Sequence, residues 1–336
     1  MSTSQSVQVH QVIALFEEIR AGRHIKRHPW TEFQLAEGEY DEIERRLERS
    51  ELLGYVKDKI RYDYDRESDR LVVRMPTAVH ELFIARVEDA IFSQLKSIRD
   101  GLGAAAAFAQ KVYPARSTEI YFPVDNFPFG RKSKHEPDAS FWHDDAQYPG
   151  VVIEVAYSQK RKRLDRLADD YLLDSDASVQ VVVGLDIEYR SIEYGRKVSR
   201  QATFSVWRTH VVSTTDGNEL RVVKEIADEA FRDDKGNPTN HPGLRLQLSD
   251  FACEELTKEA FRGEGGEIIL STQELCQYLA AAEDKIQGQR ALVRHSILPG
   301  MKKREKYAEQ EERAAKRTTD DDPDYEDRSS TKSLLE

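Results

Sequence analysis

The sequence predicts an α/β protein with a mixed central sheet flanked by helices, and two observations carry this prediction. Residues 150–156 (GVVIEVA) and 179–186 (VQVVVGLD) are apolar nearly throughout, which is typical of strands covered on both faces. The intervening segment 160–173 (KRKRLDRLADDYLL) is long enough for a helix. A strand, a helix and a strand of these lengths predict a parallel crossover unit.

Helices and a hairpin are expected before this unit. Residues 1–58 have the pattern of a helical extension, with apolar residues at helical spacing in VIALFEEIR. Residues 60–65 (IRYDYD) and 70–75 (RLVVRM) predict a hairpin around a four-residue turn. Segment 80–98 repeats apolar residues at intervals of three and four, which predicts a helix of about five turns.

Short runs rich in β-branched and aromatic residues predict the remaining strands. We expect the strands at 118–124, 138–142, 150–156 and 179–185 to share one sheet, with the 160–173 helix packed on it. Later strands are predicted at 202–207, 219–227 and 243–248, and later helices at 250–261 and 272–298. Ser271 and Glu274 form a capping-box pattern at the start of the last helix.

Four parts are expected along the chain. They are a helical N-terminal extension (1–58), an α/β domain (59–262), a C-terminal helical segment (263–317) and a disordered acidic tail (318–336). The tail has too few apolar residues to offset the entropy lost on ordering.

Composition excludes several classes of protein. The 336 residues carry a net charge of -11, which argues against a basic coat for nucleic acid but leaves room for a local basic groove. No apolar run approaches the roughly 18 residues of a membrane helix, and the first residues lack the pattern of a signal peptide. We expect an intracellular protein, cytoplasmic or nuclear, that is not secreted. The two cysteines, Cys253 and Cys276, predict neither a disulfide framework nor structural zinc.

Two carboxylates on consecutive predicted strands are the strongest functional signal. Asp138 follows Pro137 at the start of one strand, and Glu154 interrupts the apolar strand that follows. An ionised carboxylate on a strand that is covered on both faces is costly unless it has a partner. Glu154 therefore needs either a metal ion or a buried arginine. If the strands are neighbours, both carboxylates can hold one Mg²⁺ or Mn²⁺ ion, with the main-chain carbonyl of Val155 as a further ligand.

These residues resemble a known family. Pro137-Asp138, fifteen further residues and then Glu154 within VVIEVA resemble the PD-(D/E)XK, or restriction-endonuclease-like, nuclease core, closest to the Uma-type branch of restriction endonucleases. The Met75-Pro76 turn before a helix that begins near His80 and Glu81 also fits this branch, as does Tyr171 near the end of the later helix.

The resemblance implies a restriction-endonuclease-like fold and metal-dependent hydrolysis of DNA phosphodiester bonds. It implies Asp138 and Glu154 as ligands of the metal and Glu81 as an auxiliary ligand or water-positioning residue, with His80 as the competing candidate. A carboxylate-held Mg²⁺ would activate water and stabilise the charge of the transition state.

The family's lysine is missing from its two expected positions. Ala156 stands where the general pattern has lysine, and Leu167 stands four residues before Tyr171, where the named branch takes one. Lys160 and Lys162 are the nearest substitutes. The run Lys160-Arg161-Lys162-Arg163 is expected to meet phosphates, although it could also be a solvated helix turn or an import signal.

Several alternatives remain open at this point. The missing lysine favours a catalytically degenerate nuclease-fold module that binds nucleic acid or protein, with a protein partner at the C-terminal helices as one possibility. His135 and His143 flank Asp138, so an iron site with two histidines and one carboxylate is a weaker alternative. His24 and His28 are expected at the surface. The sequence does not indicate an oligomeric state.

Overall fold

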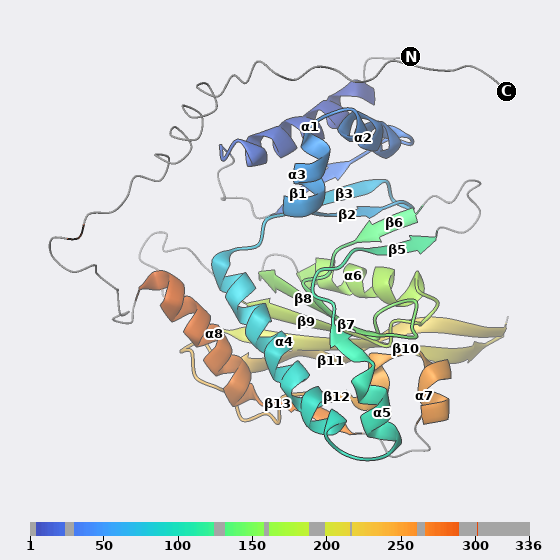
Figure 1. Cartoon of the computed structure of the whole chain (residues 1–336), viewed down its shortest axis with the longest axis vertical. Coiled ribbons are helices and arrows are strands. Elements are labelled where there is room, and N and C mark those ends of the chain that lie inside the picture. Colours follow the sequence, from blue (N-terminus) through green and yellow to red (C-terminus); the bar gives the residue numbers. More distant parts are fainter. Residues whose placement is uncertain are drawn as a thin grey trace, which may run out of the picture. The chain divides into compact units, whose positions relative to one another are not determined.

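The computed structural model describes residues 5–23, 30–123, 132–157, 161–187, 199–215, 217–260, 266–288 and 301. The chain divides into two compact units, Met1–Arg290 and Ala291–Glu336, and nearly all described residues belong to the first. In that part the first unit is mixed α/β, with helices around three β-sheets (Figure 1). No helix of the described ranges is long and apolar enough to cross a membrane.

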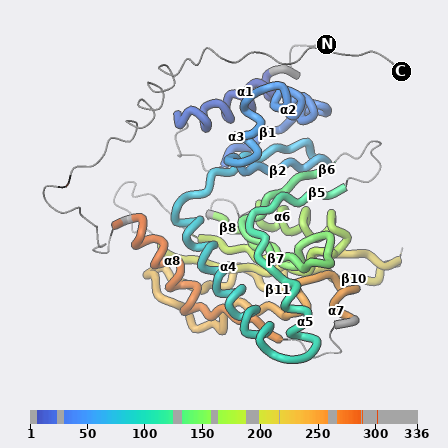
Figure 2. Tube along the Cα trace, viewed as in Figure 1, coloured from blue at the N-terminus to red at the C-terminus, as the bar shows by residue number. Residues whose placement is uncertain are grey.

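A five-stranded sheet, in the order β1-β3-β2-β6-β5, lies beside the N-terminal helices (Figure 2). Its strands are β1 (Trp30–Gln34), β2 (Arg61–Asp65), β3 (Arg70–Arg74), β5 (Ile120–Pro123) and β6 (Lys132–His135). The helices are α1 (Gln5–Arg20), α2 (Glu39–Glu48) and α3 (Leu52–Lys59). Their apolar faces bury Phe16, Ile43 and Leu47 against Tyr64 and Val73 of the predicted β2–β3 hairpin.

A six-stranded sheet, in the order β11-β10-β9-β8-β7-β4, is the largest sheet of the described residues. Its strands are β4 (Val112–Pro114), β7 (Ala139–His143), β8 (Val151–Tyr157), β9 (Val181–Ile187), β10 (Ala202–Thr214) and β11 (Gly217–Arg232). Among the pairings of these six described strands, only that of β8 with β9 is parallel. Helix α6 (Arg161–Leu173) joins these two strands, which confirms the predicted crossover.

The two faces of this sheet are covered by different helices. Val151, Ile153 and Val155 share an apolar cluster with α4 (Ala78–Arg99) and α8 (Thr272–Gln287). Val152 points to the opposite face, into a cluster with residues of α6. Because side chains alternate along a strand, Glu154 lies on the α6 face of the sheet.

The remaining elements contribute to the apolar cluster on the α4 face of this sheet. They are α5 (Ala104–Gln110), β12 (Leu244–Gln247), the 3-10 helix η2 (Leu248–Phe251), α7 (Glu254–Ala260) and β13 (Glu267–Leu270). β12 and β13 pair as a separate two-stranded sheet. The capping box that was predicted at Ser271 and Glu274 is present at the start of α8.

The structure differs from the sequence prediction in the placement of one strand. The strands at 138–142, 150–156 and 179–185 share the six-stranded sheet, but the strand expected at 118–124 is β5, which belongs to the five-stranded sheet. The reason is local pairing, because β5 pairs with β6, and β6 joins β2. The prediction that these four strands share one sheet is therefore wrong for the strand at 118–124.

Five elements were not predicted: β1, β4, β6, α5 and β13. Strand β1 lies inside the segment that was expected to be only helical, and it pairs with β3. The predicted tail at 318–336, and the parts of the last predicted helix beyond residue 288, lie outside the described residues.

Gly150, just before β8, provides a test of the packing between the central sheet and η2. A Cβ atom at this position would overlap the backbone of Asp250 and Phe251, which cannot move aside as a flexible side chain could. We expect Gly150→Ala to lower the free energy of unfolding by about 2 kcal/mol or more. The measurement is the urea denaturation midpoint.

Gly54→Ala in α3 is the matched control, because a Cβ atom there meets nothing within 4 Å. Alanine also favours the helix by about 1 kcal/mol. Equal midpoints for the two variants would show that the contact at Gly150 is not as close as described.

Candidate functional site

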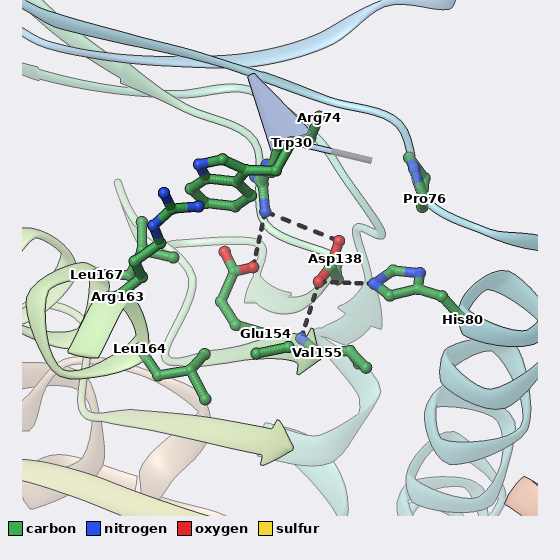
Figure 3. Close-up of a pocket in the computed structure, with 11 residues that line it drawn as sticks. Trp30, Arg74, Pro76, His80, Asp138, Glu154, Val155, Arg163, Leu164 and Leu167 are labelled. Atoms are coloured by element: carbon green, nitrogen blue, oxygen red, sulfur yellow. Dashed lines mark hydrogen bonds and ion pairs between the residues drawn. The ribbon is translucent and has the colours of Figure 1, made fainter. Parts of the chain in front are cut away.

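A cavity of about 50 Å³ lies where the two large sheets and α6 meet. This volume is enough for a few water molecules. Charged and apolar side chains share its wall (Figure 3). The lining residues are Trp30, Arg74, Pro76, His80, Asp138, Glu154, Val155, Ala156, Arg163, Leu164 and Leu167.

The structure brings Asp138 and Glu154 together at this cavity. Ala139 pairs with Ile153 across the antiparallel strands β7 and β8, so positions 138 and 154 stand opposite each other. Both carboxylates are buried, with exposed fractions of 7% and 1% for the two residues. The condition that the sequence argument set, that the two strands are neighbours, is therefore met.

A buried arginine lies between the two carboxylates. Arg74, the last residue of β3, places Nη1 2.8 Å from Glu154 Oε2 and 3.8 Å from Asp138 Oδ1. Its Nη2 lies 3.0 Å from Asp63 Oδ1 and also donates to the carbonyl of Glu136. Burial alone would lower the pKa of Arg74, but Asp63, Glu154 and Asp138 raise it well above its usual value. This guanidinium is a permanent cation that joins the two sheets.

Asp138 has further partners. Its Oδ2 accepts a hydrogen bond from the Val155 N–H at 2.8 Å and lies 3.0 Å from His80 Nε2. Its Oδ1 lies 3.4 Å from Arg61 Nη1. Burial acts to raise the pKa of Asp138, but the His80 charge and hydrogen bond, followed by Arg74, hold it well below its usual value. Asp138 is therefore ionised at neutral pH.

The pKa values of Glu154 and His80 are both raised, for different reasons. Burial, aided by the nearby Asp138 charge and opposed by Arg74, raises the pKa of Glu154 to about 8. Burial acts to lower the pKa of His80, but Asp138 outweighs it and raises that pKa to about 9. Tyr171 donates its hydroxyl to Glu154 Oε1 at 2.7 Å, and His80 is cationic at neutral pH.

The residues present do not fit the divalent ion that the resemblance implies. Both oxygens of Glu154 and both of Asp138 already face a hydrogen-bond donor or a cation. In the described ranges, no group of three or more His, Cys, Asp or Glu is placed to hold a metal ion. The guanidinium of Arg74 occupies the position between the carboxylates that a shared ion would need.

The lysine positions are apolar in the structure as well as in the sequence. Ala156 and Leu167 both line the cavity, so the two places from which a lysine would reach the site carry methyl groups instead. Lys160 lies outside the described residues, as do the side chains of Arg161 and Lys162. Arg163, the last of the predicted basic run, does line the cavity.

The other predicted candidates lie around the site or away from it. Glu81, in the first turn of α4, does not line the cavity, and its Oε1 lies 3.3 Å from Arg61 Nη1. His80 is the member of that pair that reaches Asp138. His135 and His143 are buried and do not line this cavity, which gives no support to the iron alternative. His24 and His28 lie outside the described residues.

Sequence reasoning missed Arg74 and Trp30. A signal for Arg74 existed, because it is a charged residue at the end of the apolar strand RLVVR, just as Glu154 is a charged residue within an apolar strand. Trp30 belongs to β1, which was not predicted, and its distance in sequence from α6 gave no sign of the contact.

The shifted pKa of Glu154 gives a pH prediction. Between pH 4.5 and 8 the folded state keeps a proton that the unfolded state has released, so stability must fall as the pH rises. The slope from one such proton is about 1.4 kcal/mol per pH unit. Glu154→Gln lacks this proton. From pH 5 to 6.5 we therefore expect the free energy of unfolding of the wild type to fall by about 2 kcal/mol more than that of the variant.

Denaturant unfolding at these two pH values measures the difference. His80 contributes stability that is present below pH 6.5 and is lost as the pH rises through about 9, so this interval precedes its loss in both proteins. Parallel stability curves for the two proteins would mean that Glu154 is ionised in the folded state.

Comparison with known proteins adds no assignment. A scan against models of protein families found no match, and a search of the curated proteins found no relative. The function proposed below therefore depends on the residues and contacts of this chain.

Proposed function

We propose that residues 59–262 form a restriction-endonuclease-like domain that has lost its catalytic metal site and binds the phosphates of nucleic acid. The order of the β2–β3 hairpin, α4, β7, β8, α6 and β9 supports this, because it is the order that the resemblance implies. Asp138 opposite Glu154 and Tyr171 bonded to Glu154 also support it.

The position of Arg74 is the observation that carries the proposal. A divalent ion held by Asp138 and Glu154 would have to displace a guanidinium that is bound to both and also to Asp63. Removing one partner from a buried set of charges typically costs about 3–5 kcal/mol. Mg²⁺ also keeps several waters and needs near-octahedral oxygen ligands, which this occupied pair does not offer.

The charge of the cavity wall favours an anion. Arg74, Arg163 and His80 are cationic at neutral pH and face only two carboxyl groups, Asp138 and Glu154, so the charge of the residues lining the cavity is positive even with both carboxyls ionised. A metal site would have the opposite sign.

Two donors on the cavity residues are suited to such an anion. Arg74 Nε and Arg163 Nη1 are buried N–H groups that have no hydrogen-bond acceptor within the described part of the chain. A buried donor without an acceptor costs about 1–3 kcal/mol, and the oxygens of a phosphate would supply acceptors. Nucleic acid therefore fits this site better than a protein partner does.

Metal-dependent DNA hydrolysis is the second candidate function. This function is favoured because Asp138 and Glu154 face each other across neighbouring strands. For a metal ion to bind there, Arg74 would have to leave the position between them. This function also requires a cation in the role of the missing lysine. Arg163 of α6 lines the cavity and is a candidate for this role.

Incubation with DNA separates the two candidates. We expect the purified full chain to leave plasmid and linear DNA intact in Mg²⁺ or Mn²⁺, as in chelator, and to bind a labelled oligonucleotide with an affinity that falls as salt rises. Arg163→Gln should weaken binding because one phosphate contact is lost. The slope of the logarithm of the binding constant against the logarithm of the salt concentration should become shallower by about 1.

Arg221→Gln is the control, because Arg221 is an exposed arginine of β11 that does not line the cavity. It should bind as the wild type does. Cleavage that requires the metal would replace the proposal with the second candidate, and the absence of any DNA binding would overturn the proposal.

A further inference from the structure

The wall of the cavity is not suited to a phosphate alone. Besides the charged residues described above, it contains Trp30 and Pro76, together with Leu164 and Leu167 of α6. An anion gains nothing from apolar side chains, whereas a flat, weakly polar group does. The lining therefore matches a ligand that carries both an anionic group and a planar ring.

Trp30 already holds a planar cationic group. The guanidinium of Arg163 lies over its indole ring, with Cζ 4.7 Å from the ring centroid (Figure 3). Arg163 also lies 3.1 Å from Glu32, two residues along β1 from Trp30. This contact shows that one face of the half-buried indole accepts a stacked planar group beside the cavity.

Exchange of that guanidinium for a base is energetically reasonable. A cation–π contact at a partly exposed site is worth about 0.5–1 kcal/mol, and stacking of a nucleic-acid base on an aromatic residue is worth about 1–3 kcal/mol. Arg163 would keep its charge beside the phosphate of the same nucleotide, within the cavity that it already lines.

We propose that the cavity binds one phosphate of single-stranded DNA at Arg74 and Arg163, and that the unpaired base of the same nucleotide stacks on Trp30 beside the cavity. The inference rests on the proposed function and adds the class of nucleic acid. In a duplex the bases are already paired and stacked, so none could reach the indole without being flipped out, which costs a few kcal/mol. A single strand pays no such cost.

Three labelled probes of equal length test this with the full chain in chelator. They are a thymidine single strand, the same strand in a duplex, and a strand in which the central sugars lack their bases. We expect the single strand to bind at least about 10-fold more tightly than either of the others, because only it offers both phosphates and free bases.

Two tryptophan positions give matched variants. Trp30→Leu should weaken binding of the thymidine strand about 10-fold while changing binding of the abasic strand less than about twofold, and Trp30→Phe should restore most of the loss, because it restores a stacking ring. Trp142→Leu is the control, because the Trp142 indole bonds to the Ala146 carbonyl and does not line the cavity. It should bind as the wild type does.

The outcomes separate the two levels of the proposal. If the wild type binds none of the probes, the proposed function fails. If it binds them but prefers the duplex, or binds the abasic strand as well as the thymidine strand, only the single-strand inference fails. The comparison of probes uses the wild type, so it decides the inference even if Trp30→Leu does not fold.

Discussion

The ion pairs of one buried arginine connect the two large sheets of this protein. Arg74 ends β3 in the five-stranded sheet, and its guanidinium contacts Asp63 of β2, the backbone before β7 and Glu154 of β8. A buried charge is tolerated only when its partners surround it, so the positions of these groups depend on one another. Substitution of Arg74 alone would leave several buried carboxylates without their cation.

The same interaction determines the chemistry of the site. Since His80 and Arg74 both face Asp138, the pKa of this carboxyl is lowered, whereas burial raises the pKa of the neighbouring Glu154. The pKa values of two neighbouring carboxyl groups are thus driven apart, as happens in many active sites. Here, however, a guanidinium lies between the two carboxylates, and Ala156 and Leu167 stand at the positions where the resemblance would place a lysine. The proposed function, binding of a phosphate without hydrolysis, depends on this arrangement.

Part of this site could be predicted from the sequence. Short-range signals were sufficient for the β8–α6–β9 unit and for placing the strands at 138–142 and 150–156 in one sheet, because consecutive strands are usually neighbours. The sequence also indicated that Glu154 has a cation as its partner, because it is a charged residue within an apolar strand. Whether that cation was a metal or Arg74 could not be decided, because the contact joins residues 80 positions apart in two different sheets. The membership of β5 in the other sheet was missed for the same reason, since its pattern resembles that of any half-buried strand.

The claim that Arg74 takes the place of a metal is tested most directly by thermal unfolding with and without Mg²⁺ or Mn²⁺. Arg74→Met keeps the apolar stem and removes the charge, which leaves Asp63, Asp138 and Glu154 to bind a divalent ion. At ten times the dissociation constant, such binding adds about 1.4 kcal/mol, or roughly 3 °C in melting temperature. The account predicts this rise for Arg74→Met and no rise for the wild type. A rise of equal size in the wild type would contradict it.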